Sequence, residues 1–244
     1  MKKNRYQQTL VLIKPDALKN SMTGYVLSQL SEVQCGIRFA GAKIVQVSRL
    51  MAEEHYAEHQ GKPFYPALID YLTGVAHYPD ETWKRRVIAL VYHGEKAIEK
   101  VRGVAGPTNP HDARDTQPGS IRSIGTVVPI KNKAGQVIGE HWDNLIHTSA
   151  NDKEAEREIK LWFKPNDIPP TMHMFETDVC QDHFYFLDDR ILKNYQADSI
   201  CLLAPGDTVW KSDLERLNAF GEGKLWDHTV KSVVAKYLIN ETVK

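Results

Sequence analysis

Two short, continuous apolar runs limit the kind of sheet that this chain can form. Val87 to Tyr92 and Thr9 to Ile13 carry apolar or β-branched residues at successive positions. Runs of this length are typical of strands that are buried on both faces. Lys14, Pro15 and Asp16 end the shorter run, so we expect a lysine at the end of a buried strand.

The remaining segments alternate between helical and strand patterns. Apolar spacing predicts helices at 95–102 and 153–163, and a helix that follows Thr23 and stops at Gly36. A polar helical pattern predicts a further helix at 51–60, and a short helix is predicted at 64–72 between Pro63 and Gly74. Further strands are expected at 39–47, 136–138 and 144–146. The segment 103–125 is predicted to be a long loop, which is uncommon without a function. This order of elements predicts a mixed α+β sheet domain.

Composition and charge disfavour several classes of protein. Lys and Arg number 31, as do Asp and Glu, so no strong overall field would hold nucleic acid, and no sequence-specific nucleic-acid partner is expected. Three cysteines disfavour a disulfide framework or a structural zinc cluster, and we expect Cys180 and Cys201 to be buried thiols. The polar start and the lack of a long apolar run predict a soluble, cytoplasmic protein without a membrane partner.

The segment 102–122 is a candidate phosphate clamp. Arg102, Thr108, Asn109, Arg114 and Arg122 lie in it among turn-forming Gly and Pro residues. Arginine forks match phosphate oxygens, which favours anion binding. A solvated surface loop would have the same composition, so these residues alone leave both interpretations open.

His147 is a candidate nucleophile. It lies in a short predicted strand, Ser149 follows two residues later, and Glu154 and Glu158 lie on the next predicted helix. A carboxylate or hydroxyl that holds one ring nitrogen would leave the other nitrogen free to attack. A structural histidine is the alternative. His55 and His59 are interpreted as a solvated helix face rather than as metal ligands.

A series of motifs resembles those of nucleoside diphosphate kinases, in the same order and from about Gln8 to Lys164. The motifs are TLVLIKPD from Thr9, EHY from Glu54, KPFY from Lys62, GPTNP from Gly106, QPGSIR from Gln117, NLIHTS from Asn144 and AEREIKLWF from Ala155. The resemblance implies a ferredoxin-like α+β sandwich with a four-stranded antiparallel sheet and flanking helices. It also implies ping-pong transfer of the γ-phosphate of a nucleoside triphosphate to a nucleoside diphosphate, through a phosphohistidine.

The resemblance also implies roles for particular residues. His147 matches the phosphorylated histidine, Glu158 the glutamate that orients its ring, and Ser149 an assisting hydroxyl. Lys14 and Tyr56 match a catalytic pair that lies near the transferred phosphate. The nucleotide-binding matches, of which Phe64 stacks on the base, are Lys14, Phe64, Leu68, Arg102, Thr108, Arg122 and Asn144. Mg²⁺ is expected to bind through the nucleotide phosphates, with no metal ligand from the protein.

The chain departs from the family pattern in four places. Thr148 stands where a glycine is usual and Ala150 where an acidic residue is usual, and a β-branched residue would be costly if the backbone angle there were unusual. The loop from Thr108 to Arg122 is longer than usual. Insertions are expected at about 76–85 and 126–142, the second with a hairpin turn at 131–136.

The fourth departure is an extension beyond the family core. We predict a catalytic domain at 1–165 and an extension at 166–244 that packs on the core or at a subunit interface. Family members assemble from a common dimer, so a dimer-based homo-oligomer is expected. The alternative function is a catalytically weak nucleotide-binding or regulatory protein that uses its extension to bind a partner.

Overall fold

The computed structural model describes residues 6–131, 134–224 and 229–238. The chain divides into two compact units. The sheet unit is formed by Met1–Val47 and Asp70–Ala155, and the second unit by Ser48–Ile69 and Glu156–Lys244. The division falls within two helices, α5 (Tyr65–Leu72) and α8 (Asp152–Trp162), so each of these contributes to both units.

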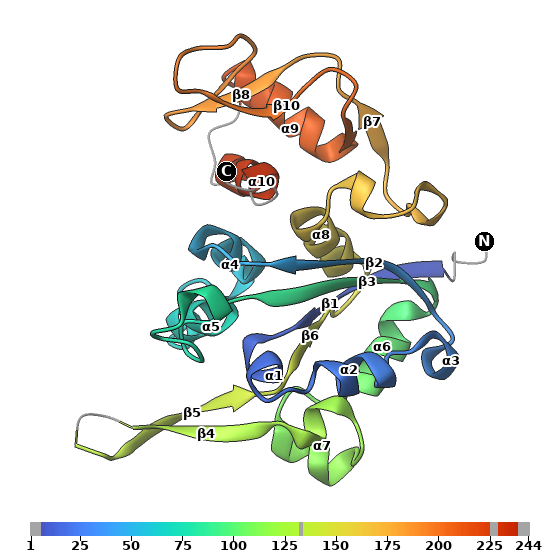
Figure 1. Ribbon diagram of the computed structural model, residues 1–244, viewed down its shortest axis with the longest axis vertical. Coiled ribbons are helices and arrows are strands. Elements are labelled where there is room, and N and C mark those ends of the chain that lie inside the picture. Colours follow the sequence, from blue (N-terminus) through green and yellow to red (C-terminus); the bar gives the residue numbers. More distant parts are fainter. Residues whose placement is uncertain (1–5, 132–133, 225–228, 239–244) are drawn as a thin grey trace. The chain divides into compact units, whose positions relative to one another are not determined.

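A four-stranded antiparallel sheet forms the centre of the sheet unit (Figure 1). Its order is β2 (Arg38–Val45), β3 (Val87–Glu95), β1 (Tyr6–Ile13) and β6 (Ile146–Thr148). Residues on both faces of β1 and β3 are buried, as their continuous apolar runs predict. This arrangement confirms the predicted α+β fold with a four-stranded antiparallel sheet.

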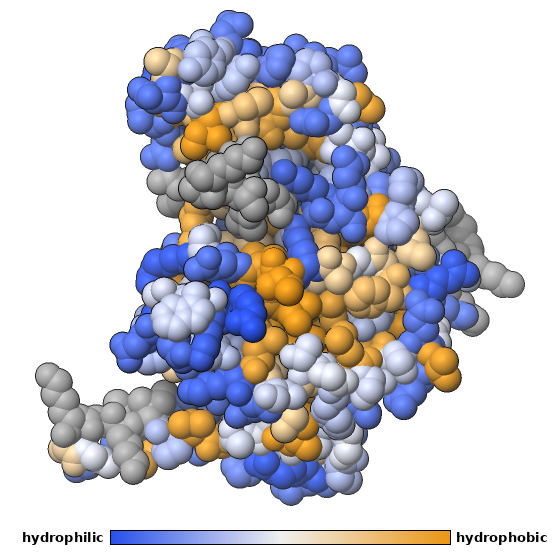
Figure 2. Space-filling model, in the orientation of Figure 1, coloured by the Kyte–Doolittle hydropathy of each residue, from blue (hydrophilic) through white to orange (hydrophobic). Residues whose placement is uncertain are grey.

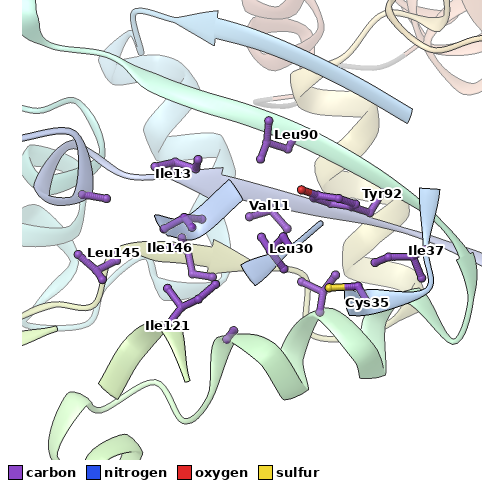
Figure 3. Packing of buried hydrophobic residues seen from close by; sticks show 14 of the residues in the cluster. Val11, Ile13, Leu30, Cys35, Ile37, Leu90, Tyr92, Ile121, Leu145 and Ile146 are labelled. Carbon is purple, nitrogen blue, oxygen red and sulfur yellow. The ribbon is translucent and has the colours of Figure 1, made fainter. Parts of the chain in front are cut away.

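One face of the sheet packs against helices of the same unit. These are α1 (Pro15–Lys19), α2 (Thr23–Gln29), α3 (Glu32–Cys35) and α6 (Ala97–Ala105). Figure 3 shows Val11 from β1 and Leu90 and Tyr92 from β3 within this core, together with Leu30 and Ile121. Alternate strand residues point to one face, which explains why every second residue of these strands joins the core cluster.

Two predicted elements of the sheet unit differ from the structure. The helix after Thr23 is broken into α2 and α3, because Ser31 has extended backbone angles between them. The predicted loop at 103–125 contains α7 (Pro110–Thr116) and the 3-10 helix η3 (Ile121–Ile124). The side chain of Asn109 accepts the N–H of His111 at 2.9 Å, and Pro110 occupies the first turn, so a capped helix begins where a loop was expected.

The two expected insertions contain regular structure. The first includes the 3-10 helix η2 (Thr82–Lys84). The second forms an antiparallel pair of β4 (Thr126–Lys131) and β5 (Val137–Asp143). The hairpin turn predicted at 131–136 includes Asn132 and Lys133, which lie outside the described residues.

The second unit combines α4 (Arg49–His55), η1 (Ala57–His59) and part of α8 with most of the C-terminal residues. After η4 (Pro165–Asp167) and η5 (Pro170–Met172), β10 (Ile200–Leu203), β8 (Phe184–Leu187) and β9 (Arg190–Leu192) form one small sheet. A two-stranded sheet is formed by β11 (Thr208–Trp210) and β7 (Thr177–Val179), and the helices α9 (Lys211–Gly221) and α10 (Thr229–Leu238) follow.

The C-terminal part of the second unit packs against helices that precede it in the chain. α10 contacts α4, and the indole N–H of the buried Trp210 donates to the backbone oxygen of Phe163 at 2.7 Å. Phe184, Val209 and Leu217 form part of a separate hydrophobic core. Cys180 is buried in that core as predicted, but Cys201 is exposed, which corrects the expectation that both thiols are buried.

Exposed hydrophobic side chains occur on the sheet unit. Figure 2 shows a group of them at the level of the four-stranded sheet. On the edge strand β2, the side chains of Phe39 and Ile44 are 41% and 68% exposed. In the described ranges, no helix has the length and apolar character that a membrane span requires.

Candidate active site

Hydrogen bonds hold the end of β1 close to the start of β6 in the sheet unit. Leu145, just before β6, has a left-handed φ of 67°, a conformation that costs free energy for a residue with a side chain. Its N–H donates to the buried Asp16 carboxylate at 2.8 Å, and its carbonyl accepts the N–H of Lys14 at 2.9 Å. These two bonds hold the start of β6 against the end of β1.

Three of the predicted residues, Lys14, Asn144 and Thr108, lie together where β1 and β6 meet. The ammonium of Lys14 donates to the side-chain oxygen of Asn144, and the amide nitrogen of Asn144 donates to the backbone oxygen of Thr108 at 2.7 Å. The ammonium also lies 4.3 Å from the centre of the Tyr71 ring. Lys14 and Asn144 are buried, whereas Thr108 is exposed.

Burial dominates the electrostatics of Lys14. Loss of hydration lowers the pKa of its ammonium to about 8, and the nearby Arg122 also lowers it, while Asp16 acts in the opposite direction. A lysine with this pKa can lose its charge in mildly alkaline solution. An incoming anion would restore the preference for the charged form.

Arg122 ties the segment after α6 to the strand that carries His147. Its guanidinium donates to the carbonyl oxygens of Gly106 at 2.9 Å and Ile146 at 3.2 Å, and its side chain is buried. Arg122 therefore places a fixed positive charge beside β6. Arg102, in the last turn of α6, is exposed.

His147 lies at the centre of β6, opposite Leu12 of β1, and is partly buried. The hydroxyl of Ser149 accepts the N–H of Leu10 at 3.0 Å, and Ser149 is fully buried, so it secures the end of the pairing between β1 and β6. Thr148 pairs with Val11 and does not have a positive φ. The β-branched residue therefore has ordinary strand geometry, and the backbone cost considered for this position does not arise.

The second unit holds the predicted aromatic residues. Tyr56 follows α4, and its ring centre lies 6.0 Å from that of His59, which in turn lies 5.7 Å from that of Phe64. Phe64 is 49% exposed, so a face of the ring is accessible. Leu68 lies one turn further along the chain, where its N–H donates to the carbonyl of Phe64 at 3.1 Å, and it is partly buried.

Glu158 is buried on α8, also in the second unit. The neighbouring Arg157 donates to the backbone oxygens of Glu54 at 3.0 Å and His55 at 3.1 Å, which fixes α8 against the end of α4. His55 is buried as well, and its Nδ1 accepts the indole N–H of Trp162 at 3.2 Å. The interpretation of His55 as part of a solvated helix face was therefore wrong.

The predicted residues are thus divided between the two units. The sheet unit contains Lys14, Arg102, Thr108, Arg122, Asn144, His147 and Ser149, and the second unit contains Tyr56, Phe64, Leu68 and Glu158. Sequence reasoning missed Asp16, whose carboxylate supports the left-handed Leu145. Its position in the first turn of α1, three residues after the last residue of β1, was the available signal.

The arrangement in the sheet unit suits phosphoryl chemistry. Lys14 and Arg122 supply positive charge, Asn144 and Thr108 supply polar groups, and His147 supplies an imidazole on a rigid strand. Phosphoryl transfer depends mainly on positioning and on stabilisation of negative charge. An imidazole is a competent nucleophile near neutral pH.

Comparisons with known proteins agree with this chemistry. The family model described as nucleoside diphosphate kinase matches residues 7–168. A nucleoside diphosphate kinase of Thermococcus kodakarensis is 36% identical over 202 residues, which cover 83% of this chain and 99% of that protein. The enzyme of Pyrococcus furiosus is 40% identical over 165 residues, covering 68% of this chain and 88% of its own.

Solved structures give the same result. A nucleoside diphosphate kinase of Aquifex aeolicus matches with a TM-score of 0.53 and 28% identity, covering 67% of this chain and 99% of that one. The Borrelia burgdorferi enzyme, a transition state mimic with bound vanadate and ADP, matches with a TM-score of 0.52 and 28% identity over 68% and 92% of the two chains. The family match covers most of the chain, and the protein therefore belongs to the nucleoside diphosphate kinase family.

Proposed function

We propose that His147 carries the phosphate in this nucleoside diphosphate kinase. The γ-phosphate of a nucleoside triphosphate passes to an imidazole nitrogen of His147 and then to a nucleoside diphosphate, so each half-reaction breaks one P–O or P–N bond as it forms the other. The observation that carries this proposal is the polar cluster of Lys14, Asn144 and Thr108, which lies in the same unit as His147 and is secured to β6.

The other site residues have distinct proposed roles. Lys14, Arg102, Thr108 and Arg122 would bind phosphates, Asn144 and Lys14 would bind the ribose, and Tyr56 would lie near the transferred phosphate. Phe64 and Leu68 would form the base-binding surface, for which the 49% exposure of Phe64 is supporting evidence. Stacking reads the face of a base rather than its edges, which suits an enzyme that accepts several bases.

Glu158 and Ser149 are proposed to act through His147. A carboxylate that accepts the N–H of one ring nitrogen fixes the tautomer and leaves the other nitrogen as the nucleophile. The burial of Glu158 supports this role, because a buried carboxylate requires a hydrogen-bonding partner.

Mg²⁺ is proposed to enter with the nucleotide. Lys14, Arg122, Asn144 and Thr108 offer positive or neutral groups, which suit phosphate oxygens rather than a bare cation. When bound, Mg²⁺ would neutralise part of the phosphate charge. The residues of this chain would then position the phosphate chain and the imidazole.

We further propose a cytoplasmic, dimer-based homo-oligomer. Free Cys35, Cys180 and Cys201 are compatible with a reducing compartment. The exposed Phe39 and Ile44 on the edge strand β2 offer a surface for a second copy, since edge strands pair readily. The packing of α10 against α4 supports an extension, residues 166–244, that stabilises the catalytic domain at 1–165.

The decisive experiment is steady-state phosphate transfer from ATP to dTDP with Mg²⁺. Wild type should turn over, and His147→Ala should lose turnover while it keeps its fold and its nucleotide binding. A folded wild-type protein that binds nucleotide without transfer would instead indicate a nucleotide-binding or regulatory protein. His183→Ala, an exposed histidine in the second unit, is the matched control and should retain activity.

A further inference from the structure

Three potential metal ligands meet where the two insertions of the sheet unit come together. His77 belongs to the first insertion, His141 lies on β5 of the second, and Asp143 ends the same strand. The Nε2 atoms of both histidines lie 2.8 Å from the same carboxylate oxygen, Oδ1 of Asp143. All three potential ligand atoms lie within 4.8 Å of one another.

The fold holds each of these side chains in place. His141 and Asp143 are two residues apart on β5, so they project from the same face of the strand. His77 is fixed by its backbone, because its N–H donates to the carbonyl of Gly74 at 3.2 Å and its carbonyl accepts the ammonium of Lys19 at 3.0 Å.

A buried aromatic ring forms one wall of the group. The ring centre of Tyr71 lies 4.9 Å from that of His77 and 4.6 Å from that of His141. The side chain of His77 is 8% exposed, that of His141 21% and that of Asp143 14%. The three side chains are therefore largely shielded from solvent but still reachable from it. Convergent, partly buried ligands of this kind are preorganised for an ion.

The donor set matches one class of ion. Two imidazole nitrogens and one carboxylate oxygen are typical protein ligands for Zn²⁺ and similar first-row metals, whose remaining positions are commonly filled by water. Bonds of about 2.1 Å in tetrahedral geometry place ligand atoms about 3.4 Å apart, so the two contacts of 2.8 Å need to open only slightly. Mg²⁺ prefers an all-oxygen shell, so this group disfavours it.

We propose that the two insertions build a binding site for a divalent transition-metal ion, with Nε2 of His77, Nε2 of His141 and a carboxylate oxygen of Asp143 as its ligands. This site is separate from the Mg²⁺ that accompanies the nucleotide. It adjoins the phosphate-binding cluster, because Asp143 precedes Asn144 and the Tyr71 ring also contacts the ammonium of Lys14. The ion would stabilise the position of that cluster and would not itself contact the substrate.

Zn²⁺ alone is the probe. The full chain, freed of metal with a chelator, is titrated with Zn²⁺ and the uptake is measured by equilibrium dialysis and calorimetry in excess Mg²⁺. Wild type should bind one equivalent that His141→Gln and Asp143→Asn weaken at least about 100-fold, since changes even outside the ligand shell can cost about 10- to 100-fold. Co²⁺ should give the visible absorption of a low-coordinate site in wild type and not in either variant.

Two control variants separate this site from other histidines. His183→Gln makes the same substitution at an exposed residue of the second unit, and His147→Gln removes the proposed nucleophile. Both variants should still bind one equivalent of Zn²⁺. Circular dichroism verifies that His141→Gln and Asp143→Asn, which alter partly exposed side chains, remain folded. No Zn²⁺ uptake by wild type, uptake unchanged in these two variants, or uptake lost in His147→Gln instead would each overturn the proposal and leave a hydrogen-bonded group only.

Discussion

At the scale of single residues, the buried ammonium of Lys14 should determine how the enzyme responds to alkaline pH. Its pKa is lowered to about 8, mainly by burial, so the free enzyme loses this positive charge as the pH rises through that value. Phosphate binding favours the charged form. We therefore expect kcat/KM, which reports the free enzyme, to fall above about pH 8.

Replacement of the lysine by arginine provides the control for this pH dependence. Arginine keeps its proton throughout the accessible range, so Lys14→Arg should lose the alkaline limb even if its maximal rate is lower. The measurement is kcat/KM from pH 6 to pH 10 for both proteins, with ATP and dTDP as substrates. An identical alkaline limb in Lys14→Arg would mean that another group controls it.

Asp16 should matter through the backbone of Leu145 rather than through substrate. Removal of its carboxylate in Asp16→Ala leaves the buried N–H of Leu145 without its acceptor, which should lower the free energy of unfolding by about 1–3 kcal/mol. Asp16→Asn keeps a side-chain oxygen and should lose less. Urea unfolding measures both, and an Asp16→Ala protein as stable as wild type would contradict this role.

Residues in local sequence motifs could be predicted as candidates from the sequence, whereas features that depend on the folded backbone could not. Lys14, Asn144 and His147 could be singled out as candidates because they lie in short motifs at or beside predicted strands. The left-handed Leu145 was missed, and a strand was expected from 144, because no glycine or asparagine at this position signals a positive φ. His77 and Asp143 are far apart in sequence, so only the fold reveals that they meet.

At the scale of elements, the end of α6 depends on Gly106. Its φ is 80° with an extended ψ of 178°, a region almost restricted to glycine, and a Cβ there would lie 2.2 Å from the hydroxyl of Ser120. Gly106→Ala should destabilise the protein by about 1–3 kcal/mol. It should also reduce activity, because the carbonyl of Gly106 accepts a hydrogen bond from the guanidinium of Arg122, a proposed phosphate-binding residue.

Gly103 is a matched control within the same helix. A Cβ at Gly103 meets no atom within 4 Å, so Gly103→Ala should stabilise the protein by about 0.5–1 kcal/mol through helix propensity. Thermal and urea unfolding compare the two variants. Equal changes in the free energy of unfolding for the two substitutions would show that the backbone conformation at Gly106 does not determine its effect on stability.

In the second unit, a buried ion pair joins α10 to α9. The ammonium of Lys236 donates to the carboxylate of Asp213, which also accepts the hydroxyl of Tyr237 at 3.1 Å. Lys236→Met leaves a buried carboxylate without its cation and should cost about 3–5 kcal/mol. The double variant Lys236→Met/Asp213→Leu should recover most of this loss, and a double variant as unstable as the single one would contradict the account.

Sequence predicted the elements of the sheet unit better than their connections. Continuous apolar runs gave β1 and β3 within a few residues, and amphipathic spacing gave α8. The small strands β7, β9 and β11 were missed because three residues are too few to produce a pattern. The helix α7 was missed because its turn-forming residues outweighed the cap at Asn109.

At the scale of the whole molecule, the chain combines a nucleoside diphosphate kinase core with additional segments. The family match spans 7–168, and the C-terminal residues lie beyond it. Its compact units do not follow the sequence order, because α4 and α10 pack together although they lie far apart in the chain. Sequence patterns report local structure, so such packing was not predictable from them.

Isolation of the phosphoenzyme shows whether His147 carries the phosphate. Wild type is mixed with γ-labelled ATP and Mg²⁺ in the absence of an acceptor, and the protein is then examined for label that survives base and is lost in acid. We expect one labelled phosphate per active chain, released on addition of dTDP with formation of dTTP, and none in His147→Ala. Label that persists in folded His147→Ala, or a folded wild type that binds ATP and never becomes labelled, would contradict the assignment of His147.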